Sequence, residues 1–202
     1  ARRLAVVPGS RRLVEASCQL LATYSGRPKL AGLSRFMASL EGVYFLRRGL
    51  FLPEELPGLM SPELAVLGLE RLGGSPPGIT PAEAHDGVRA VGLLESTVYL
   101  RNQLLRDGDW ASMAHSVELR TPLVDAALLD RLGPRLSAFR NGAGKRMLAQ
   151  APGRPLPRGV VSRPKTGFGL PMSEWIQDRL GPRSPGMPWA RQWALTVVDA
   201  TP

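Results

Sequence analysis

The sequence predicts a mainly α-helical fold. In most segments the apolar residues recur at intervals of three and four, which places them on one face of a helix. Serine, threonine, aspartate or proline stands where these segments begin, and glycine or proline stands where they end, as at natural helix termini. No segment shows the alternation of apolar and polar residues that is typical of a half-buried strand.

Two helices are expected in the first quarter of the chain. Ser10 can cap the first helix, and Gly26 can end it. A second helix is expected from about Leu30 to near Gly49, because apolar residues recur at three and four within it. One face of each helix should therefore be buried.

Proline and glycine set the boundaries of the next elements. Pro53 is expected at the first position of a short helical turn, and Ser61 should cap a helix that closes at Gly73–Gly74. The loop 73–78 lacks the lysine and hydroxyl of a phosphate-binding loop and is expected to be a connector. Thr80 and Glu83 form a capping-box pattern.

The long helix that begins at Thr80 is expected to end at Asp107–Gly108 and to lead into a charged stretch, Asp109 to Asp125. There Glu118 and Arg120 flank one leucine, and side chains two residues apart in extended chain share a side. Taken alone, this spacing favours an internal ion pair over a catalytic pair.

The remaining third begins with short helices over about 125–132 and 144–151, of which the first can be capped by Asp125. Five prolines and four glycines between positions 152 and 171 predict a stiff loop without regular structure. A helix carrying Trp175 follows. The tail, 182–202, should form a helix whose tryptophans pack in a core.

Within that loop, Arg163 and Lys165 stand beside glycines, whose bare backbone N–H groups and neighbouring cations suit phosphate oxygens. An ordinary solvated surface loop remains an alternative at this point. Lysine is otherwise rare in this chain, occurring elsewhere only at positions 29 and 145.

The formal net charge of +9 suits an anionic partner. The arginines are scattered and no aromatic residues interleave with them, so a nucleic-acid partner is not expected.

No apolar run approaches the about 20 residues that cross a bilayer, so a soluble, cytoplasmic protein is expected. One cysteine, Cys18, and two histidines make a poor metal set, and no metal site is expected. Cys18 should be a small core residue on its helix.

Residues 112–125, Ser-Met-Ala-His-Ser-Val-Glu-Leu-Arg-Thr-Pro-Leu-Val-Asp, resemble a signature of the glutamine-hydrolysing asparagine synthetases. Downstream, Lys-Arg-Met-Leu at 145–148 and Arg-Pro-Lys-Thr-Gly-Phe-Gly-Leu-Pro at 163–171, followed by Trp175, resemble that family's later motifs in order and spacing. The clear similarity covers about 99–180. Residues before 99 fit only in helix pattern, and 182–202 fits a shortened terminal helix.

The resemblance implies that residues 1–202 form one partial domain, the helical C-terminal half of an α/β synthetase domain. That domain has the adenine-nucleotide α-hydrolase-like (ATP pyrophosphatase) fold. In this family, ATP with Mg activates a carboxylate, that of the aspartate side chain, as an acyl-adenylate with release of pyrophosphate. Ammonia from glutamine then displaces AMP to give asparagine.

The resemblance also implies roles for individual residues. Lys165, with Arg163, would stabilise the charge on the departing pyrophosphate. Glu118 would position the acyl intermediate or accept a proton from the attacking amine, and Arg120 would fix its rotamer. Asp109 and Asp125 are assigned to orienting the loop.

Several departures from the family pattern bear on this reading. Trp110 and Thr121 replace the usual arginine and aliphatic residue, and Ala149–Gln150 replace an arginine-glutamate pair. The family's Ser-Gly-Gly-x-Asp-Ser nucleotide loop and its N-terminal glutaminase domain do not occur in these residues. ATP and Mg are therefore expected to bind mainly to residues outside this chain, which should be inactive alone and part of a longer protein.

Two alternatives remain open at the level of sequence. The same acyl-adenylate chemistry could act on another acid, in lactam formation or in peptide or sugar amidation. Alternatively, the chain could be a non-catalytic basic module that binds RNA or protein.

Overall fold

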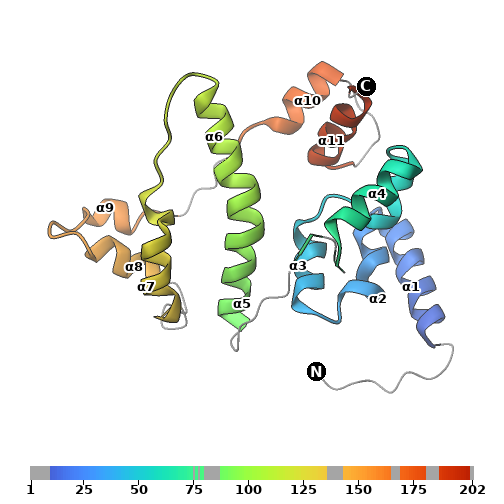
Figure 1. Cartoon of the computed structure of the whole chain (residues 1–202), viewed down its shortest axis with the longest axis horizontal. Helices are drawn as coiled ribbons and strands as arrows, with labels where there is room; N and C mark the ends of the chain where they lie inside the picture. The colour runs from blue at the N-terminus through green and yellow to red at the C-terminus, as the bar shows by residue number, and fades with distance from the viewer. Residues whose placement is uncertain are drawn as a thin grey trace. The chain divides into compact units, whose positions relative to one another are not determined.

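The computed structural model describes residues 10–74, 76, 78–79, 87–135, 143–164, 169–180 and 187–200. Within these ranges all regular structure is helical and no strand is present, as predicted (Figure 1). Two compact units are formed, one by residues 1–81 with 169–202 and the other by residues 82–168. The expectation that residues 1–202 form one partial domain stays a prediction.

The first unit contains most of the helices whose ends were predicted from local signals. Gly26 (φ +64°) and Gly73 (φ +60°) follow the two helices that they were expected to end. The Ser61 hydroxyl accepts a hydrogen bond from the Leu64 N–H at 3.2 Å and caps its helix as expected. The elements are α1 (Ser10–Ser25), η1 (Pro28–Gly32), α2 (Leu33–Phe36), α3 (Leu40–Arg48), η2 (Pro53–Gly58), α4 (Pro62–Leu72), α10 (Met172–Leu180) and α11 (Trp189–Ala200).

The prediction of one helix from about Leu30 to near Gly49 is wrong, because this range forms η1, α2 and α3 in succession. Ser39 breaks the helix and caps α3, its hydroxyl accepting from the Gly42 N–H at 3.0 Å. A Cβ at Gly42 would lie 1.9 Å from the Phe36 carbonyl oxygen. The break therefore lets α3 fold back on α2, and only glycine fits at their contact.

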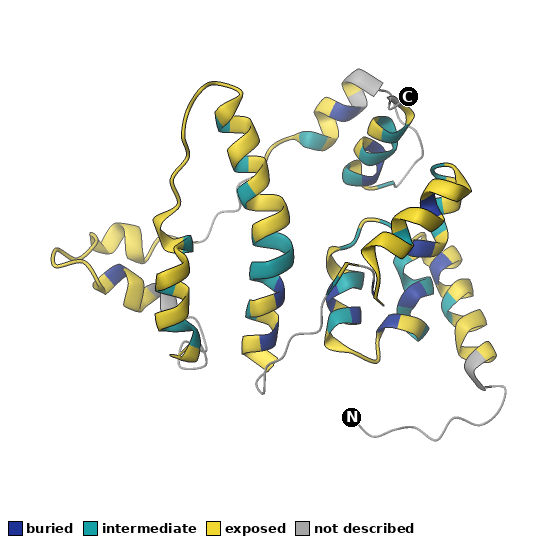
Figure 2. Cartoon of the chain, in the orientation of Figure 1, coloured by how far each residue is buried: buried dark blue, intermediate teal, exposed yellow. Residues whose placement is uncertain are grey.

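The core of the first unit is small and lies between α2, α3 and η2. Phe36, Tyr44 and Leu52 are almost fully buried. The ring centroids of Phe36 and Phe45 lie 5.0 Å apart, with the two rings tilted relative to each other. Ile176 brings α10 into the buried set. Figure 2 shows that buried residues are concentrated on α1 to α4 and on α10 and α11 in this unit.

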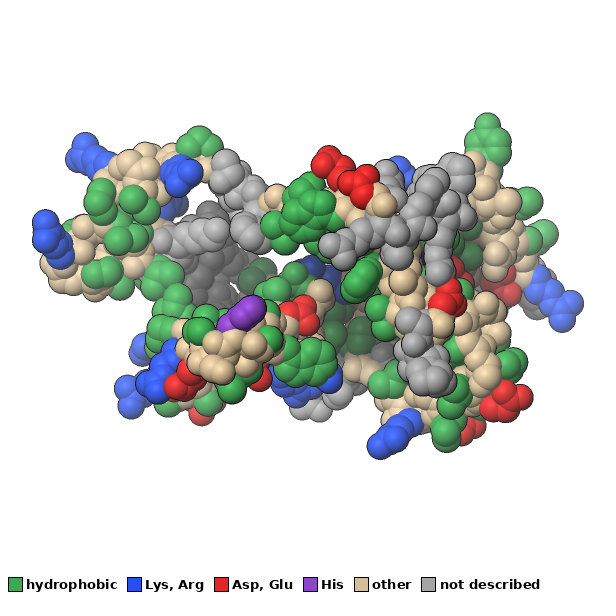
Figure 3. Space-filling model, turned by 90° about the horizontal axis from the view of Figure 1, so that it is seen from above, with side chains coloured by type: hydrophobic (Ala, Val, Ile, Leu, Met, Phe, Trp, Pro, Cys, Tyr) green, Lys and Arg blue, Asp and Glu red, His purple; other side chains and the backbone are tan. Residues whose placement is uncertain are grey.

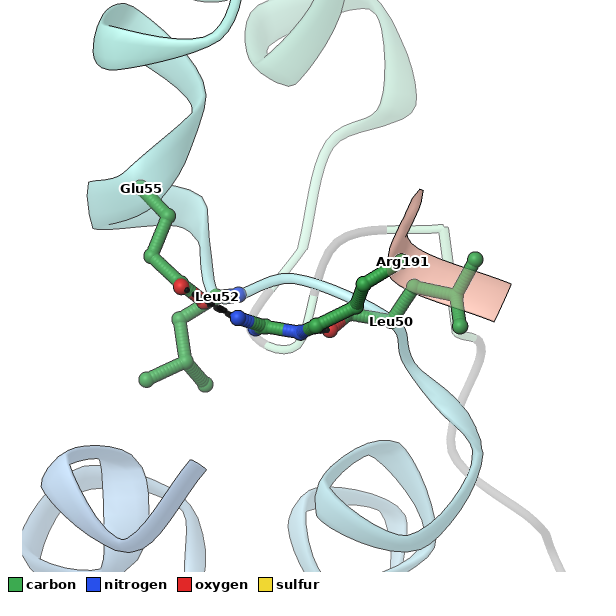
Figure 4. A network of polar contacts seen from close by, with 4 residues as sticks. All are labelled: Leu50, Leu52, Glu55 and Arg191. Carbon is green, nitrogen blue, oxygen red and sulfur yellow. Dashed lines mark hydrogen bonds and ion pairs between the residues drawn. The ribbon is translucent and has the colours of Figure 1, made fainter. Parts of the chain in front are cut away.

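Arg191 of α11 is buried and joins this helix to the loop around η2 (Figure 4). Its two terminal nitrogens donate to both carboxylate oxygens of Glu55, at 2.9 and 2.7 Å. Its Nε donates to the Leu50 carbonyl oxygen at 2.8 Å, and its guanidinium lies 4.5 Å from the centre of the Phe51 ring. Glu55 also accepts from the Leu52 N–H at 2.7 Å. All the polar groups of this pair thus have partners.

The two tryptophans of α11 are about half exposed, so the prediction that the tail tryptophans pack in a core is wrong. On α11 the buried positions are Arg191 and Gln192, whereas Trp189 and Trp193 lie four apart on another face. The inward face of α11 is thus polar, because its partners are carbonyl and carboxylate oxygens. Cys18, also predicted to be a core residue, is only partly buried.

The second unit is organised around one continuous helical rod (Figure 1). It consists of α5 (Gly87–Leu94), the π-helical segment η3 (Glu95–Leu105) and α6 (Arg106–Met113). The expected end at Asp107–Gly108 is wrong, and the expected start at Thr80 lies outside the described residues. A glycine inside a helix lowers the stability of that helix by only about 1 kcal/mol relative to alanine, so Gly108 weakens the helix without ending it. The Leu119 side chain packs against Gly108, and its Cδ2 would lie 3.0 Å from a Cβ at that position.

After the rod, the described residues of the second unit form short elements, namely η4 (Pro122–Val124), α7 (Ala126–Leu132), α8 (Ala143–Gln150) and α9 (Arg158–Val161). The helices α7 and α8 agree with the prediction. The loop from 152 to 171 was expected to lack regular structure, but Pro157 precedes one helical turn, α9, within it. Proline suits this position because its fixed φ leads into a helix.

Few apolar side chains of the second unit are buried. Among its described residues only Ala90, Leu94 and Ala149 belong to the buried hydrophobic set. Figure 3 shows hydrophobic side chains at the surface, with the visible lysine and arginine side chains spread between them rather than gathered in one patch. No described helix is both long and apolar enough to cross a membrane.

We predict that Glu55→Gln lowers the free energy of unfolding by about 3–5 kcal/mol, because it leaves the buried Arg191 guanidinium without its counter-charge. Urea denaturation followed by circular dichroism measures this change. The matched control is Glu54→Gln in the neighbouring residue, whose exposed pair with Arg35 should contribute no more than about 1 kcal/mol. Equal losses in the two variants would contradict the proposed importance of Arg191.

Candidate functional site

The stretch from Asp109 to Asp125 begins on a helix and ends on a helix cap. Asp109 lies in the first turn of α6 and is exposed, so it precedes the loop that it was expected to orient. Asp125 caps α7 as predicted, because its carboxylate accepts from the Leu128 N–H at 2.8 Å. The loop between them is thus fixed at its far end by Asp125, and the orienting role of Asp109 stays a prediction.

A tight turn after α6 directs the chain into this loop. The His115, Ser116 and Val117 N–H groups donate to carbonyl oxygens of Ser112 and Met113 at 2.9–3.0 Å. Ser116 adopts the left-handed conformation, with φ +57°, and is the only such non-glycine residue among the described ones. The turn therefore depends on strained backbone at one position.

Glu118 and Arg120 form a two-point ion pair in the extended segment after this turn. Arg120 Nε donates to Glu118 Oε1 at 3.2 Å, and Arg120 Nη2 donates to Oε2 at 3.1 Å. The side chains are 70% and 81% exposed, respectively. The pair matches the same-side geometry that the spacing predicted, and it presents an oriented carboxylate to solvent.

The phosphate-binding residues predicted further along the chain are only partly described. Arg163 follows α9 and is exposed. Lys165, the strongest candidate from the sequence, lies outside the described residues. Among the residues that the structure describes, no hydrogen bond or ion pair joins Arg163 to Glu118 or Arg120. The structure therefore brings Glu118 and Arg120 together, and their proximity to Lys165 stays a prediction.

A cavity of about 710 Å³ lies elsewhere, in the first unit. It is partly open to solvent and is lined by parts of α1, η1, α2 and η2, including Glu15, Arg35 and Glu55. None of the residues predicted for catalysis lines it. Three of its polar side chains are already engaged, because Glu54 pairs with Arg35 and Glu55 pairs with Arg191.

Sequence reasoning missed the charged cluster beside this cavity, which comprises Lys29, Glu55 and Arg191. Burial lowers the pKa of Lys29 below its usual value of 10.5, and the positive charges of Arg191 and Arg47 lower it further, while Glu55 raises it. The rarity of lysine was the only sequence signal at this place. Helical periodicity gives no indication of this charged cluster, because Lys29 and Arg191 are far apart in the chain.

Comparison with known proteins decides the family. The profile of asparagine synthase matches residues 11–184, which is most of the chain. The chain belongs to the asparagine synthase family. This match reaches back to residue 11, well before the 99–180 range in which the motifs were recognisable. Together with the helical structure of the described residues, it supports the predicted adenine-nucleotide α-hydrolase-like synthetase domain.

One curated relative is the glutamine-hydrolysing asparagine synthetase 1 of Bacillus subtilis (strain 168). It is 26% identical over 103 residues, which cover 50% of this chain and 16% of the relative. The chain therefore spans a small part of the length of this asparagine synthase family member. No solved structure matches the chain. These similarities support a ligase-type relationship of the amidotransferase kind.

We predict that Ser116→Val destabilises the chain by about 1–2 kcal/mol, because a β-branched residue is poorly accommodated at positive φ. Ser116→Gly should have no such cost, since glycine adopts this conformation freely. Thermal unfolding of both variants measures the difference. A valine variant as stable as the glycine variant would show that the turn does not require the left-handed conformation.

Proposed function

We propose that this chain is part of an ATP-dependent amidotransferase that adenylates a carboxylate, that of the aspartate side chain, and transfers ammonia from glutamine to it. The products would be asparagine, AMP and pyrophosphate. The observation that carries the proposal is the asparagine synthase match over residues 11–184, which includes the motif around Glu118. The named activity of the relative supports the same reaction type.

The geometry of the Glu118–Arg120 pair suits the role assigned to it. A carboxylate that contacts the reactants must be reachable, and Glu118 is exposed. Arg120 donates to both carboxylate oxygens, which limits the rotamers of Glu118. Glu118 would then position the acyl intermediate or accept a proton from the attacking amine.

Lys165 and Arg163 would supply positive charge for the departing pyrophosphate. Negative charge builds on its oxygens as the acyl-adenylate forms, and preorganised cations stabilise that charge. Arg163 is exposed and has no ion-pair partner among the described residues, so its guanidinium is available for an anionic ligand. The roles of both residues rest on their place in the family motif.

The nucleotide and its metal would be held mainly by residues outside this chain. Among the described residues, no group of three or more His, Cys, Asp or Glu could hold a metal ion. The chemistry proposed for this chain is confined to orienting the reactants and stabilising charge.

In the complete protein, Lys165→Ala should reduce ATP–pyrophosphate exchange by about 10²–10³-fold, the typical effect of removing one charge-stabilising group. The fold should be retained, as checked by circular dichroism. Arg154→Ala is the matched control, because it removes an exposed cation from the same proline-rich loop. Unchanged exchange in the Lys165 variant would overturn the role of this lysine.

Glu118→Gln should slow amide formation by about 10²-fold, because the amide can neither accept the proton nor hold Arg120 in the same way. The control is Glu63→Gln, which alters an exposed glutamate in the first turn of α4. Both variants are assayed for asparagine formation with ammonia as the nitrogen source. If they behave alike, Glu118 does not take part in the reaction.

A further inference from the structure

The chain reverses its direction where α6 ends (Figure 1). The Val117 N–H donates to the Ser112 carbonyl oxygen at 3.0 Å, and the Ser116 N–H donates to the Met113 carbonyl oxygen at 3.0 Å. With Ser116 in the left-handed conformation, these two bonds form the Schellman pattern that commonly closes a helix. The turn therefore holds Val117 beside the end of α6, and the residues after it run back along the same helix.

Leu119 contacts α6 about one turn before this point, at Gly108. Its Cδ2 would lie 3.0 Å from a Cβ at that position, so the leucine packs on the bare backbone of the glycine. From Ser112 back to Gly108 a helix advances about 6 Å, and from Val117 to Leu119 extended chain advances about 6.6 Å. Because these two advances nearly match, the contact follows directly from the turn.

This contact sets the direction in which the Glu118–Arg120 pair faces. Side chains alternate along extended chain, so Glu118 and Arg120 lie on the side opposite to Leu119. Their ion pair confirms that the two share one side. With Leu119 against the helix, the carboxylate is turned away from α6, and the Glu118 side chain is 70% exposed. Arg120 thus limits the rotamers of Glu118, whereas Leu119 fixes which way the pair points.

We propose that Gly108 and Leu119 are positioning residues for Glu118, a role that rests on the amidotransferase function proposed above. Carbon atoms pack best at about 3.5–4.0 Å, so a Cβ at position 108 would displace Leu119 by about 0.5 Å or more. Alanine would otherwise suit this position, since it is a better helix former than glycine. Room for Leu119, rather than stability of the helix, is therefore the reason for glycine at this place.

Gly108→Ala tests this role in the complete protein. It should slow amide formation with ammonia about tenfold, because a misplacement of 1 Å can cost about 10²-fold in rate. ATP–pyrophosphate exchange should be retained, because Glu118 acts when the amine attacks. The matched control is Gly92→Ala in α5, where an added Cβ would meet open space. Equal losses of both activities in the Gly108 variant would indicate general destabilisation and overturn the positioning role.

Leu119→Ala removes the other half of the contact and should also slow amide formation. Its control is Leu123→Ala, which truncates a similarly exposed leucine of the same stretch, 59% against 56%. The double variant, Gly108→Ala with Leu119→Ala, should lose less activity than the product of the two single losses, because residues in contact are not independent. Losses that simply multiply would overturn the proposed contact.

The contact can also be observed without an activity assay, in the 202-residue chain labelled with ¹³C at the leucine methyl groups. A nuclear Overhauser effect should join the Leu119 methyl protons to the α protons of Gly108, and Leu119→Ala assigns the signal. Absence of this effect overturns the proposal. A loss of amide formation in Glu118→Gln but not in Gly108→Ala also overturns it and leaves the proposed function intact. No loss in either variant overturns the role of Glu118 itself, and the positioning role with it.

Discussion

The pair of Arg191 and Glu55 holds the first unit together, because this unit is built from two chain segments that the second unit separates in sequence. A buried ion pair stabilises a fold only when its remaining polar groups are satisfied. Arg191 meets this condition through the Leu50 carbonyl and the Phe51 ring, and Glu55 meets it through the Leu52 N–H. Few large apolar side chains are buried among the described residues of this unit, so the position of α11 depends on this ion pair.

The same contact explains the charge left at Lys29. Glu55 satisfies the more deeply buried cation, Arg191, and its hydrogen-bonding capacity is then used. Glu55 still raises the pKa of Lys29 in η1, although its oxygens form their hydrogen bonds with Arg191.

Helix ends could be predicted from the sequence where the signal is local. Ser61 and Asp125 cap their helices as expected, because a cap needs only its own side chain and the next turn of backbone. The break at Ser39 and the continuation through Gly108 were missed, since both depend on contacts that periodicity does not encode. A glycine at position 42 accommodates the Phe36 carbonyl, and the one at position 108 accommodates Leu119.

The same distinction applies to the candidate sites. The contact between Glu118 and Arg120 followed from their separation of two residues in extended chain. The cluster at Lys29 brings together elements that are far apart in the chain, and its paired residues Glu55 and Arg191 are separated by 136 positions. Such contacts leave no periodic pattern in the sequence. On α11 the apolar stripe predicted that the tryptophan face is buried, whereas the buried face is the one that carries Arg191. A functional residue held by long-range polar contacts is therefore visible only after folding, whereas one held by its neighbours in an extended segment is visible in the sequence.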